Sequence, residues 1–288
     1  MTEAPAVVDA HMHLWAIPTN PWYAHLQPFA EQVGAPHLYA DFTYPDYAAA
    51  AQGVRPEALV HVSATTTPGT FLEEARWIDE VADAAGLNLV TVGTIDPDSD
   101  ADRVVADLER QAASPRFRGI RVFPALDTAH PAVPVVLDWL AEHDHVFDLV
   151  CDPSSAADWL ALLARYPDLR VAVEHTGSPD MLSADGFAAW SEALTALSRR
   201  PGLACKLTGL GMLSGALDAE RLRPWIDRTF AVMGPDRVLF GSNMPIESMA
   251  GSFADWIEIT LAAAGGLSAA EADRFLAGNA RDLYRIDA

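Results

Sequence analysis

The sequence predicts an α/β fold, a single-domain (β/α)₈ (TIM) barrel, and three observations support this prediction. Eight short β-rich runs alternate with stretches that carry apolar residues at helical spacing. A chain of 288 residues with 50% hydrophobic residues can bury the core of one such barrel. No Gly/Ser-rich linker, charge block or low-complexity tract divides the chain, so residues 1–288 are treated as one domain.

The β-rich runs share a polar ending. Nearly every run finishes in polar or ionisable residues that are followed by Gly, Pro, Ser or Asp. In barrel enzymes the chemistry lies at these carboxyl ends of the strands, so the pattern predicts an active site there. In chain order, the runs begin at Ala6, Ala58, Asn88, Phe117, His145, Arg170, Leu203 and Arg237.

Helices are expected between the runs, because apolar residues recur there with the period of an α-helix. The expected helices cover residues 70–85, 100–113, 134–142, 155–166, 187–198 and 219–233. Residues 15–47 are the exception, since this segment is long, weakly periodic and rich in Pro and aromatic residues. It is expected to form a lid or insertion loop over the barrel mouth. Trp15, at its start, is a candidate substrate contact.

The strongly negative charge argues against nucleic acids and membrane surfaces as partners. The formal net charge is -21, from 40 acidic and 19 basic residues, and it would repel phosphate backbones and anionic lipids. Neither a targeting segment nor a membrane span is evident in the sequence, so a cytoplasmic location is expected. The two cysteines, Cys151 and Cys205, lie in apolar runs and are expected to be buried thiols. The expected partner is a small-molecule substrate, and homo-oligomerisation stays open.

His11 and His13 end the first run, in the sequence VVDAHMHLW. Alternate residues of a strand face the same side, so both imidazoles are expected to point into the barrel at its carboxyl end. Two imidazoles in that position can share a metal ion or a substrate oxygen. The alternative is a pair of polar residues that merely end a strand. We take the pair as the first candidate catalytic and metal-binding residues.

The sixth run, RVAVEHTGSP, supplies a third candidate histidine, His175. It lies just before a Gly/Pro turn, where its imidazole can converge on the first two. The preceding Glu174 is expected to point the other way by strand alternation and to have a supporting or structural role. His61, within the second run, is expected to pack in the core.

Arg121 and Lys206 are basic residues within apolar runs of a very acidic chain. Burying either cation without a partner would be costly, so each needs an anion. That anion is either a protein carboxylate or the carboxylate or developing oxyanion of a substrate. Arginine suits bidentate carboxylate recognition, so Arg121 is expected to contact substrate. For Lys206 a substrate contact and a structural ion pair both stay open.

Asn243 and Glu247 follow the eighth run, in RVLFGSNMPIE. An asparagine can orient a substrate or donate a hydrogen bond, but it cannot accept a proton as a carboxylate base does. Glu247 can act as that base if the loop after the eighth strand folds inward. Both are therefore candidate catalytic residues.

Taken together, these motifs resemble the amidohydrolase-2 family of TIM-barrel hydrolases. Within it the chain is most similar to the branch of sugar lactonases and 2-pyrone-4,6-dicarboxylate lactonase. The resemblance implies that His11 and His13 are the first-strand pair, His175 the sixth-strand histidine and Lys206 the seventh-strand basic residue. The motifs are DAHMHLW from Asp9, GIRVF from Gly119, EHTGSP from Glu174, CKLTGL from Cys205, LFGSNMP from Leu239 and GNARDLYRI from Gly278.

The chain departs from this family at Asn243, where the family pattern G-S-D-W-P has an aspartate that binds metal or activates water. The change removes a negative charge and should weaken binding of a divalent cation. Some relatives of this branch work without a metal. The site is therefore expected to hold either one divalent ion such as zinc, bound by His11, His13 and His175, or none.

The leading functional hypothesis is hydrolytic opening of a lactone or similar ester in a small carboxylated molecule. Arg121 would hold the substrate carboxylate, while His11 and His13 polarise the carbonyl, joined by Lys206 if it contacts substrate. Water would be activated by His175 or by Glu247. Two alternatives stay open, namely a metal-dependent decarboxylase of an unsaturated or aromatic acid and a non-catalytic ligand-binding barrel.

Overall fold

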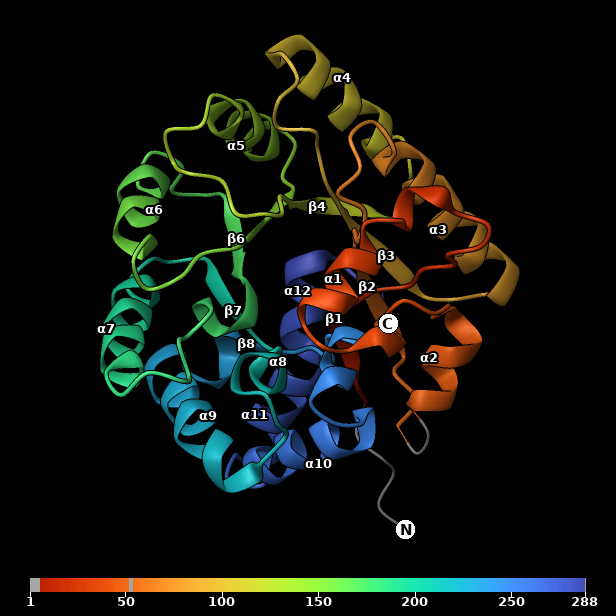
Figure 1. Cartoon of the computed structure of the whole chain (residues 1–288). Helices are drawn as coiled ribbons and strands as arrows, with labels where there is room; N and C mark the ends of the chain where they lie inside the picture. The colour runs from red at the N-terminus through yellow and green to blue at the C-terminus, as the bar shows by residue number, and fades with distance from the viewer. Residues whose placement is uncertain (1–5, 52–53, 288) are drawn as a thin grey trace.

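The computed structural model describes residues 6–51 and 54–287, and in this part of the chain eight parallel strands surround a barrel axis (Figure 1). The order of the strands around the barrel follows their order in the chain. The predicted fold class is confirmed, and each strand lies within one of the eight predicted runs. The strands are β1 (Val8–Met12), β2 (Ala58–Val62), β3 (Leu89–Gly93), β4 (Phe117–Arg121), β5 (Val146–Leu149), β6 (Arg170–Val173), β7 (Leu203–Leu207) and β8 (Val238–Phe240).

Helices form the outer layer, and each of the six predicted helical stretches coincides with one to within two residues at its start. These are α3 (Phe71–Ala85), α4 (Ala101–Ala112), α5 (Ala132–Glu142), α6 (Ala156–Leu163), α7 (Gly186–Ser198) and α9 (Ala219–Met233). No helix within the described ranges is long and apolar enough to cross a bilayer. Both cysteines are buried and unpaired, as expected. The remaining helices are α1 (Leu26–Gln32), α2 (Tyr44–Ala50), α8 (Leu210–Ser214), α10 (Phe253–Ala264), α11 (Ala269–Asp273) and α12 (Asn279–Tyr284).

The barrel closes between β1 and the chain just beyond β8. The backbone N–H of Asn243 donates to the carbonyl of His11 at 2.7 Å, and the N–H of His13 donates to the carbonyl of Met244 at 2.8 Å. These bonds lie at the carboxyl ends of the two strands. The closure therefore places the first-strand histidines directly beside the eighth-strand residues at the barrel mouth.

A β-bulge in β1 aims His11 into the barrel. Asp9 pairs with Leu59 and Met12 pairs with His61. Three residue steps along β1 therefore match two steps along β2, so β1 contains one extra residue. Ala10 packs in the interior cluster, whereas Met12 packs in the outer cluster under the helices. His11 therefore faces the interior together with its neighbour Ala10, although an unbroken alternation would place it on the opposite side.

Asp9 holds this bulge in place. Its fully buried carboxylate accepts hydrogen bonds from the N–H of His11 at 3.2 Å, the N–H of Ser242 at 2.8 Å and the hydroxyl of Tyr47 at 2.7 Å. One side chain thus links the bulge, the eighth strand and α2.

Asp9→Ala is expected to lower the free energy of unfolding by about 3 kcal/mol, because it leaves three buried donors without an acceptor. Urea unfolding monitored by circular dichroism measures the change. Tyr47→Phe removes only one of the three bonds, so its expected cost is about 1 kcal/mol. Equal costs for the two variants would contradict the proposed role of Asp9.

Residues 15–47 contain two 3₁₀ turns, α1 and the start of α2, and the segment contacts the chain just beyond β2 and β8. His25 Nε2 lies 3.0 Å from the carbonyl oxygen of Ala64, which follows β2. His37 Nε2 lies 3.0 Å from the hydroxyl of Ser248, which follows β8. The segment therefore covers one side of the barrel mouth, and in Figure 1 α1 lies in front of β1.

Candidate active site

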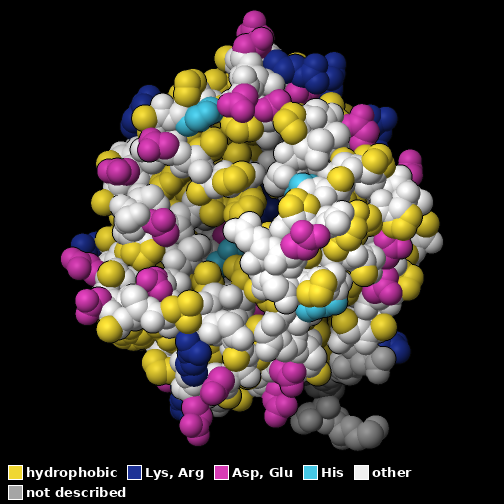
Figure 2. Space-filling view, viewed as in Figure 1, with side chains coloured by type: hydrophobic (Ala, Val, Ile, Leu, Met, Phe, Trp, Pro, Cys, Tyr) yellow, Lys and Arg dark blue, Asp and Glu magenta, His cyan; other side chains and the backbone are white. Residues whose placement is uncertain are grey.

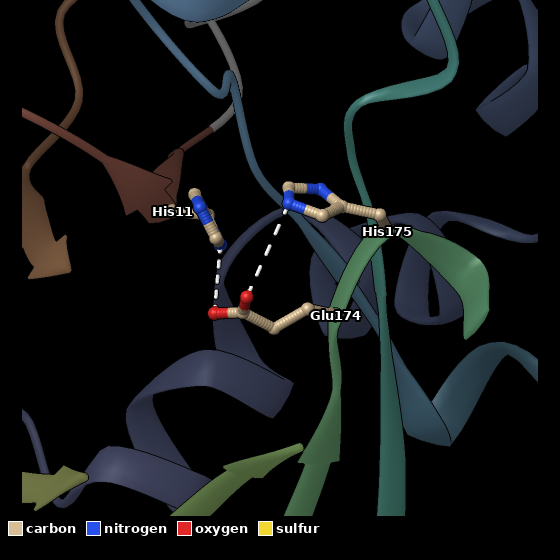
Figure 3. A group of neighbouring side chains, drawn as sticks. All are labelled: His11, Glu174 and His175. Carbon is tan, nitrogen blue, oxygen red and sulfur yellow. Dashed lines mark ion pairs between the residues drawn. The ribbon is translucent and has the colours of Figure 1, made fainter. Parts of the chain in front are cut away.

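A hollow opens near the centre of the barrel face, and histidine and basic side chains are visible at its floor (Figure 2). His11 from β1 meets Glu174 and His175, which directly follow β6 (Figure 3). His11 Nδ1 lies 3.4 Å from Glu174 Oε1, and His175 Nε2 lies 4.0 Å from Glu174 Oε2. The ring centroids of the two histidines are 4.8 Å apart. The structure thus brings the first-strand and sixth-strand histidines together around a carboxylate.

The expectation that Glu174 points away from the site was wrong. Strand alternation ends at Val173, because residues Glu174–Gly177 form a 3₁₀ turn. Within this turn His175 and Thr176 have left-handed backbone angles, with φ of 49° and 54°. The turn lets two consecutive side chains, Glu174 and His175, reach the same site. A period-2 reading of the sequence cannot detect such a turn.

Several polar atoms at this floor are buried and lack a hydrogen-bond partner among the described residues. They are both ring nitrogens of His11, both carboxylate oxygens of Glu174 and Nδ1 of His175. Leaving a buried polar atom unsatisfied costs about 1–3 kcal/mol, and folded proteins rarely do so. The convergence of five such atoms therefore marks a place that takes up an ion, water or ligand.

His13 lies beside this group, with its ring centroid 5.0 Å from that of His11. Its Nδ1 is 2.7 Å from the carbonyl oxygen of Val62. A carbonyl only accepts, so Nδ1 carries the hydrogen and Nε2 offers a lone pair. Trp15 stacks at 6.5 Å from His13, is 1% exposed and donates its indole N–H to the carbonyl of Ala40. The indole thus packs against His13 and links the two ends of the 15–47 segment through its bond to Ala40.

All three histidines are neutral at pH 7. Burial lowers the pKa of His11 and His13 well below the usual value and that of His175 to about 3. The cations Arg121 and Lys206 act in the same direction. A neutral imidazole is the form that accepts a proton or binds a metal ion.

Lys206 forms an internal ion pair. It is fully buried, and its ammonium donates to Asp148 on β5, whose other oxygen accepts the hydroxyl of Tyr284 at 2.7 Å. This pairing favours the structural alternative for Lys206. Lys206 also lies 3.8 Å from Glu174, so it contributes positive potential at the floor. Asp148 was not identified from the sequence, although it lies within the fifth β-rich run.

Arg121, like Lys206, lies beside Glu174. Its side chain is 10% exposed, one guanidinium nitrogen lies 3.5 Å from Glu174, and another donates to the carbonyl of Ser63. The guanidinium also lies 5.4 Å from the ring of Phe123, which is 51% exposed. Arg121 is therefore placed between the buried carboxylate and the solvent side of the hollow.

Asn243 and Glu247 form a second polar group at the end of β8. Asn243 has a left-handed backbone, with φ of 56°, and its amide nitrogen donates to Glu247 Oε2 at 3.2 Å. The backbone N–H of Gly211 donates to Glu247 Oε1 at 2.6 Å. Burial nevertheless raises the pKa of Glu247 to about 7. The loop after β8 thus folds inward and buries a carboxyl group that titrates near neutral pH.

Comparisons with known proteins match nearly the whole chain to a hydrolase family. The family model described as amidohydrolase matches residues 8–286. An L-fucono-1,5-lactonase of Burkholderia ambifaria is 31% identical over 297 residues, covering 97% of this chain and 96% of the relative.

Solved structures share the fold at lower identity. An amidohydrolase from Burkholderia multivorans with bound zinc is 24% identical with a TM-score of 0.82, covering 98% of this chain and 100% of that one. A putative 2-pyrone-4,6-dicarboxylic acid hydrolase from Pseudomonas putida is 21% identical with a TM-score of 0.75, covering 99% and 100%. Both likenesses extend over nearly the whole of each chain.

Proposed function

The chain belongs to the amidohydrolase family, and from this premise we propose that it hydrolyses a lactone or related carboxylic ester of a small carboxylated molecule. The full-length similarity to a lactonase supports the type of bond. The observation that carries the proposal is the floor of the hollow, where unpartnered imidazole and carboxylate atoms lie beside the cation Arg121. This set of groups suits attack of water on an ester carbonyl.

In the proposed reaction Glu247 is the general base. Its pKa of about 7 matches neutral pH, whereas His175, with a pKa of about 3, would be a poor base. Glu247 accepts a proton from the attacking water as the oxygen bonds to the carbonyl carbon. When the ring C–O bond breaks, the protonated Glu247 returns that proton to the leaving alkoxide, and a hydroxy acid results. Asn243 positions the base through its hydrogen bond.

Arg121 binds the substrate carboxylate, and its charge also stabilises the developing oxyanion. His11 and His175 line the floor next to the reacting carbonyl, and His13 offers its Nε2 lone pair from the side. Lys206 stays paired with Asp148 and acts only through its charge.

A divalent metal is implied by the zinc in the structure from Burkholderia multivorans. The unpartnered buried nitrogens of His11 and the Nε2 of His175, which faces Glu174, fit such an ion, because neutral imidazole is a preferred zinc ligand. These two histidines, with His13 beside them, would hold it. When bound, the ion supplies Lewis-acid polarisation of the carbonyl.

A panel of lactones tests the proposal directly. Purified protein should release one proton per lactone opened in a weakly buffered assay, with L-fucono-1,5-lactone and carboxylated lactones included. Release of carbon dioxide from unsaturated or aromatic acids in a parallel assay would instead indicate a decarboxylase. If no lactone or ester in the panel is opened, the proposed reaction is wrong.

Arg121→Lys tests how substrate is held. The variant keeps a positive charge near Glu174 but loses the planar fork that binds a carboxylate through two hydrogen bonds. We expect kcat/KM to fall roughly 10-fold to 100-fold for a carboxylated lactone. An uncharged lactone of the same ring size should change by less than about 3-fold, since no carboxylate is bound. Equal losses on both substrates would argue against carboxylate binding by Arg121.

Gly209→Ala tests the placement of His175. A Cβ on Gly209 would lie 2.5 Å from His175 Nδ1, so the imidazole must move. A displacement of about 1 Å in a catalytic group can cost 100-fold, and we expect a loss of that order in kcat/KM. Gly215→Ala is the matched control, because Gly215 also has a positive φ but its Cβ would contact nothing within 4 Å. Similar activity in the two variants would contradict the predicted role.

A further inference from the structure

We propose that Glu174 is itself a metal ligand and that the ion is held by His11, Glu174 and His175, with the carboxylate as the one charged ligand. One nitrogen from each histidine and one oxygen of Glu174 all lie within 4.8 Å of one another, and all three residues are buried except for a small part of His175. The proposal names the ligands of the divalent ion considered under the proposed function. It rests on the presence of that ion and not on the lactone-opening reaction.

The separations are close to those of a bound ion. Ligand bonds to zinc are about 2.0–2.2 Å, so tetrahedral neighbours lie roughly 3.3–3.6 Å apart. Glu174 Oε1 is already 3.4 Å from His11 Nδ1, and Glu174 Oε2 is 4.0 Å from His175 Nε2. The widest separation within the group is up to 4.8 Å, so the side chains have to close by up to about 1.2 Å to reach this spacing. In Figure 3 the Glu174 carboxylate lies between the two imidazoles and faces both.

The hydrogen-bond inventory points to an ion. Both carboxylate oxygens of Glu174 are buried without a donor, although Arg121 and Lys206 lie only 3.5 and 3.8 Å away. Both ring nitrogens of His11 are also buried without a partner, and His175 turns its Nε2 toward Glu174 at 4.0 Å. A buried carboxylate with an imidazole on either side is a donor set that a divalent cation of the zinc type satisfies.

The other candidate ligands near this point fit the ion less well. His13 keeps Nε2 free while Nδ1 bonds to the Val62 carbonyl, but it does not belong to the group whose ligand atoms lie within 4.8 Å of one another. Asn243 is uncharged and directs its amide nitrogen to Glu247. Glu174 is therefore the carboxylate that can balance the charge of the ion at the barrel floor.

Neither neighbouring cation forms a hydrogen bond to Glu174. Lys206 is paired with Asp148, and Arg121 lies 3.5 Å from Glu174 without bonding to it, so the carboxylate is free to face an ion. Replacing Glu174 with an amide would leave an ion with only neutral ligands beside an excess positive charge. Metal affinity should therefore depend strongly on this carboxylate.

Isothermal titration of zinc chloride into chelator-treated full-length protein measures that affinity. Wild type is expected to bind one equivalent. Glu174→Gln should bind at least about 100-fold more weakly, which exceeds the 10-fold to 100-fold loss typical of a supporting residue. Glu247→Gln is the matched carboxyl-to-amide control, and its zinc affinity should stay within about 3-fold of wild type. Equal affinities of wild type and Glu174→Gln would overturn the proposal.

Zinc-edge anomalous diffraction from wild-type crystals needs no variant. The expected peak lies about 2.0–2.2 Å from a Glu174 oxygen and from one nitrogen each of His11 and His175. A peak on His13 without Glu174, or no peak at the floor, would overturn the assignment. Both readouts report binding, so the lactone assay fails or succeeds independently of them.

Discussion

Glu247→Gln is expected to lower kcat for lactone opening by about 100-fold to 10,000-fold, which is the usual contribution of a general base. The amide keeps the shape of the side chain and can still accept the hydrogen bond that Gly211 donates. It cannot take a proton from water at neutral pH. Steady-state kinetics on the best lactone of the panel measure the loss. A drop of less than about 10-fold would remove Glu247 from the base position.

The pH profile provides an independent test of the same residue. The pKa of Glu247 is raised to about 7, so its basic form is lost as the pH falls through 7. Wild-type kcat/KM is therefore expected to fall about tenfold per unit below pH 7 and to level off above it. In Glu247→Gln this limb should be absent. A wild-type profile that is flat from pH 5 to 8 would contradict the assignment.

The same pKa has the opposite effect on stability. Burial favours the protonated form of Glu247 in the folded state, so its ionisation costs stability as the pH rises from about 4.5 to 7. The full cost, about 3 kcal/mol, is present above pH 7. Glu247→Gln should therefore gain thermal stability relative to wild type at pH 8 and gain less at pH 5. A less stable variant at both values would show that the amide disturbs the packing.

The barrel and its first histidines were predictable because both depend on local patterns. Apolar runs with polar endings identify strands whose carboxyl ends meet at one mouth. His11 was correctly predicted to face the barrel interior, but strand alternation alone does not explain this orientation. Ala10 and His11 both face inward, because the bulge held by Asp9 inserts one residue in β1. A bulge stabilised by contacts to β8 and α2 leaves no local signal.

Glu174 was misplaced because its side was counted from His175. Alternation along β6 puts Glu174 on the interior side with Ala172, and a left-handed turn at His175 and Thr176 brings His175 to that side as well. Such angles are uncommon for residues other than glycine, and tertiary contacts have to stabilise them. The eighth-strand departure at Asn243 was visible in the sequence. Its consequence, a hydrogen bond to Glu247, depends on the path of the following loop.

The identity of the anion that pairs with Lys206 is a further feature that the sequence pattern did not reveal. A buried lysine requires an anion, and that requirement was predicted from composition alone. Asp148 satisfies it from 58 residues earlier in the chain, across the barrel interior. Burial raises the pKa of Asp148, and the charge of Lys206 opposes this shift. The two opposite charges therefore stabilise each other in a fully buried site.

Asp148→Ala should therefore be one of the most destabilising single substitutions in the chain. Removing one member of a buried pair leaves an uncompensated charge, and the expected loss is about 3–5 kcal/mol in the free energy of unfolding. Tyr284→Phe, which removes only the hydroxyl bonded to Asp148, should cost about 1 kcal/mol. Chemical denaturation at pH 7 gives both values.

The double variant Asp148→Leu with Lys206→Met tests whether charge or packing causes the loss. Two apolar side chains of similar volume remove both charges, and such replacements are often neutral or stabilising. The double variant is therefore expected to recover more than half of the stability lost in Asp148→Ala. If it is as unstable as the single variant, the loss comes from packing around β5 and β7, and the ion pair contributes little. Recovery of stability together with reduced lactone hydrolysis would instead mean that the charge of Lys206 is retained for its effect on Glu174, 3.8 Å away.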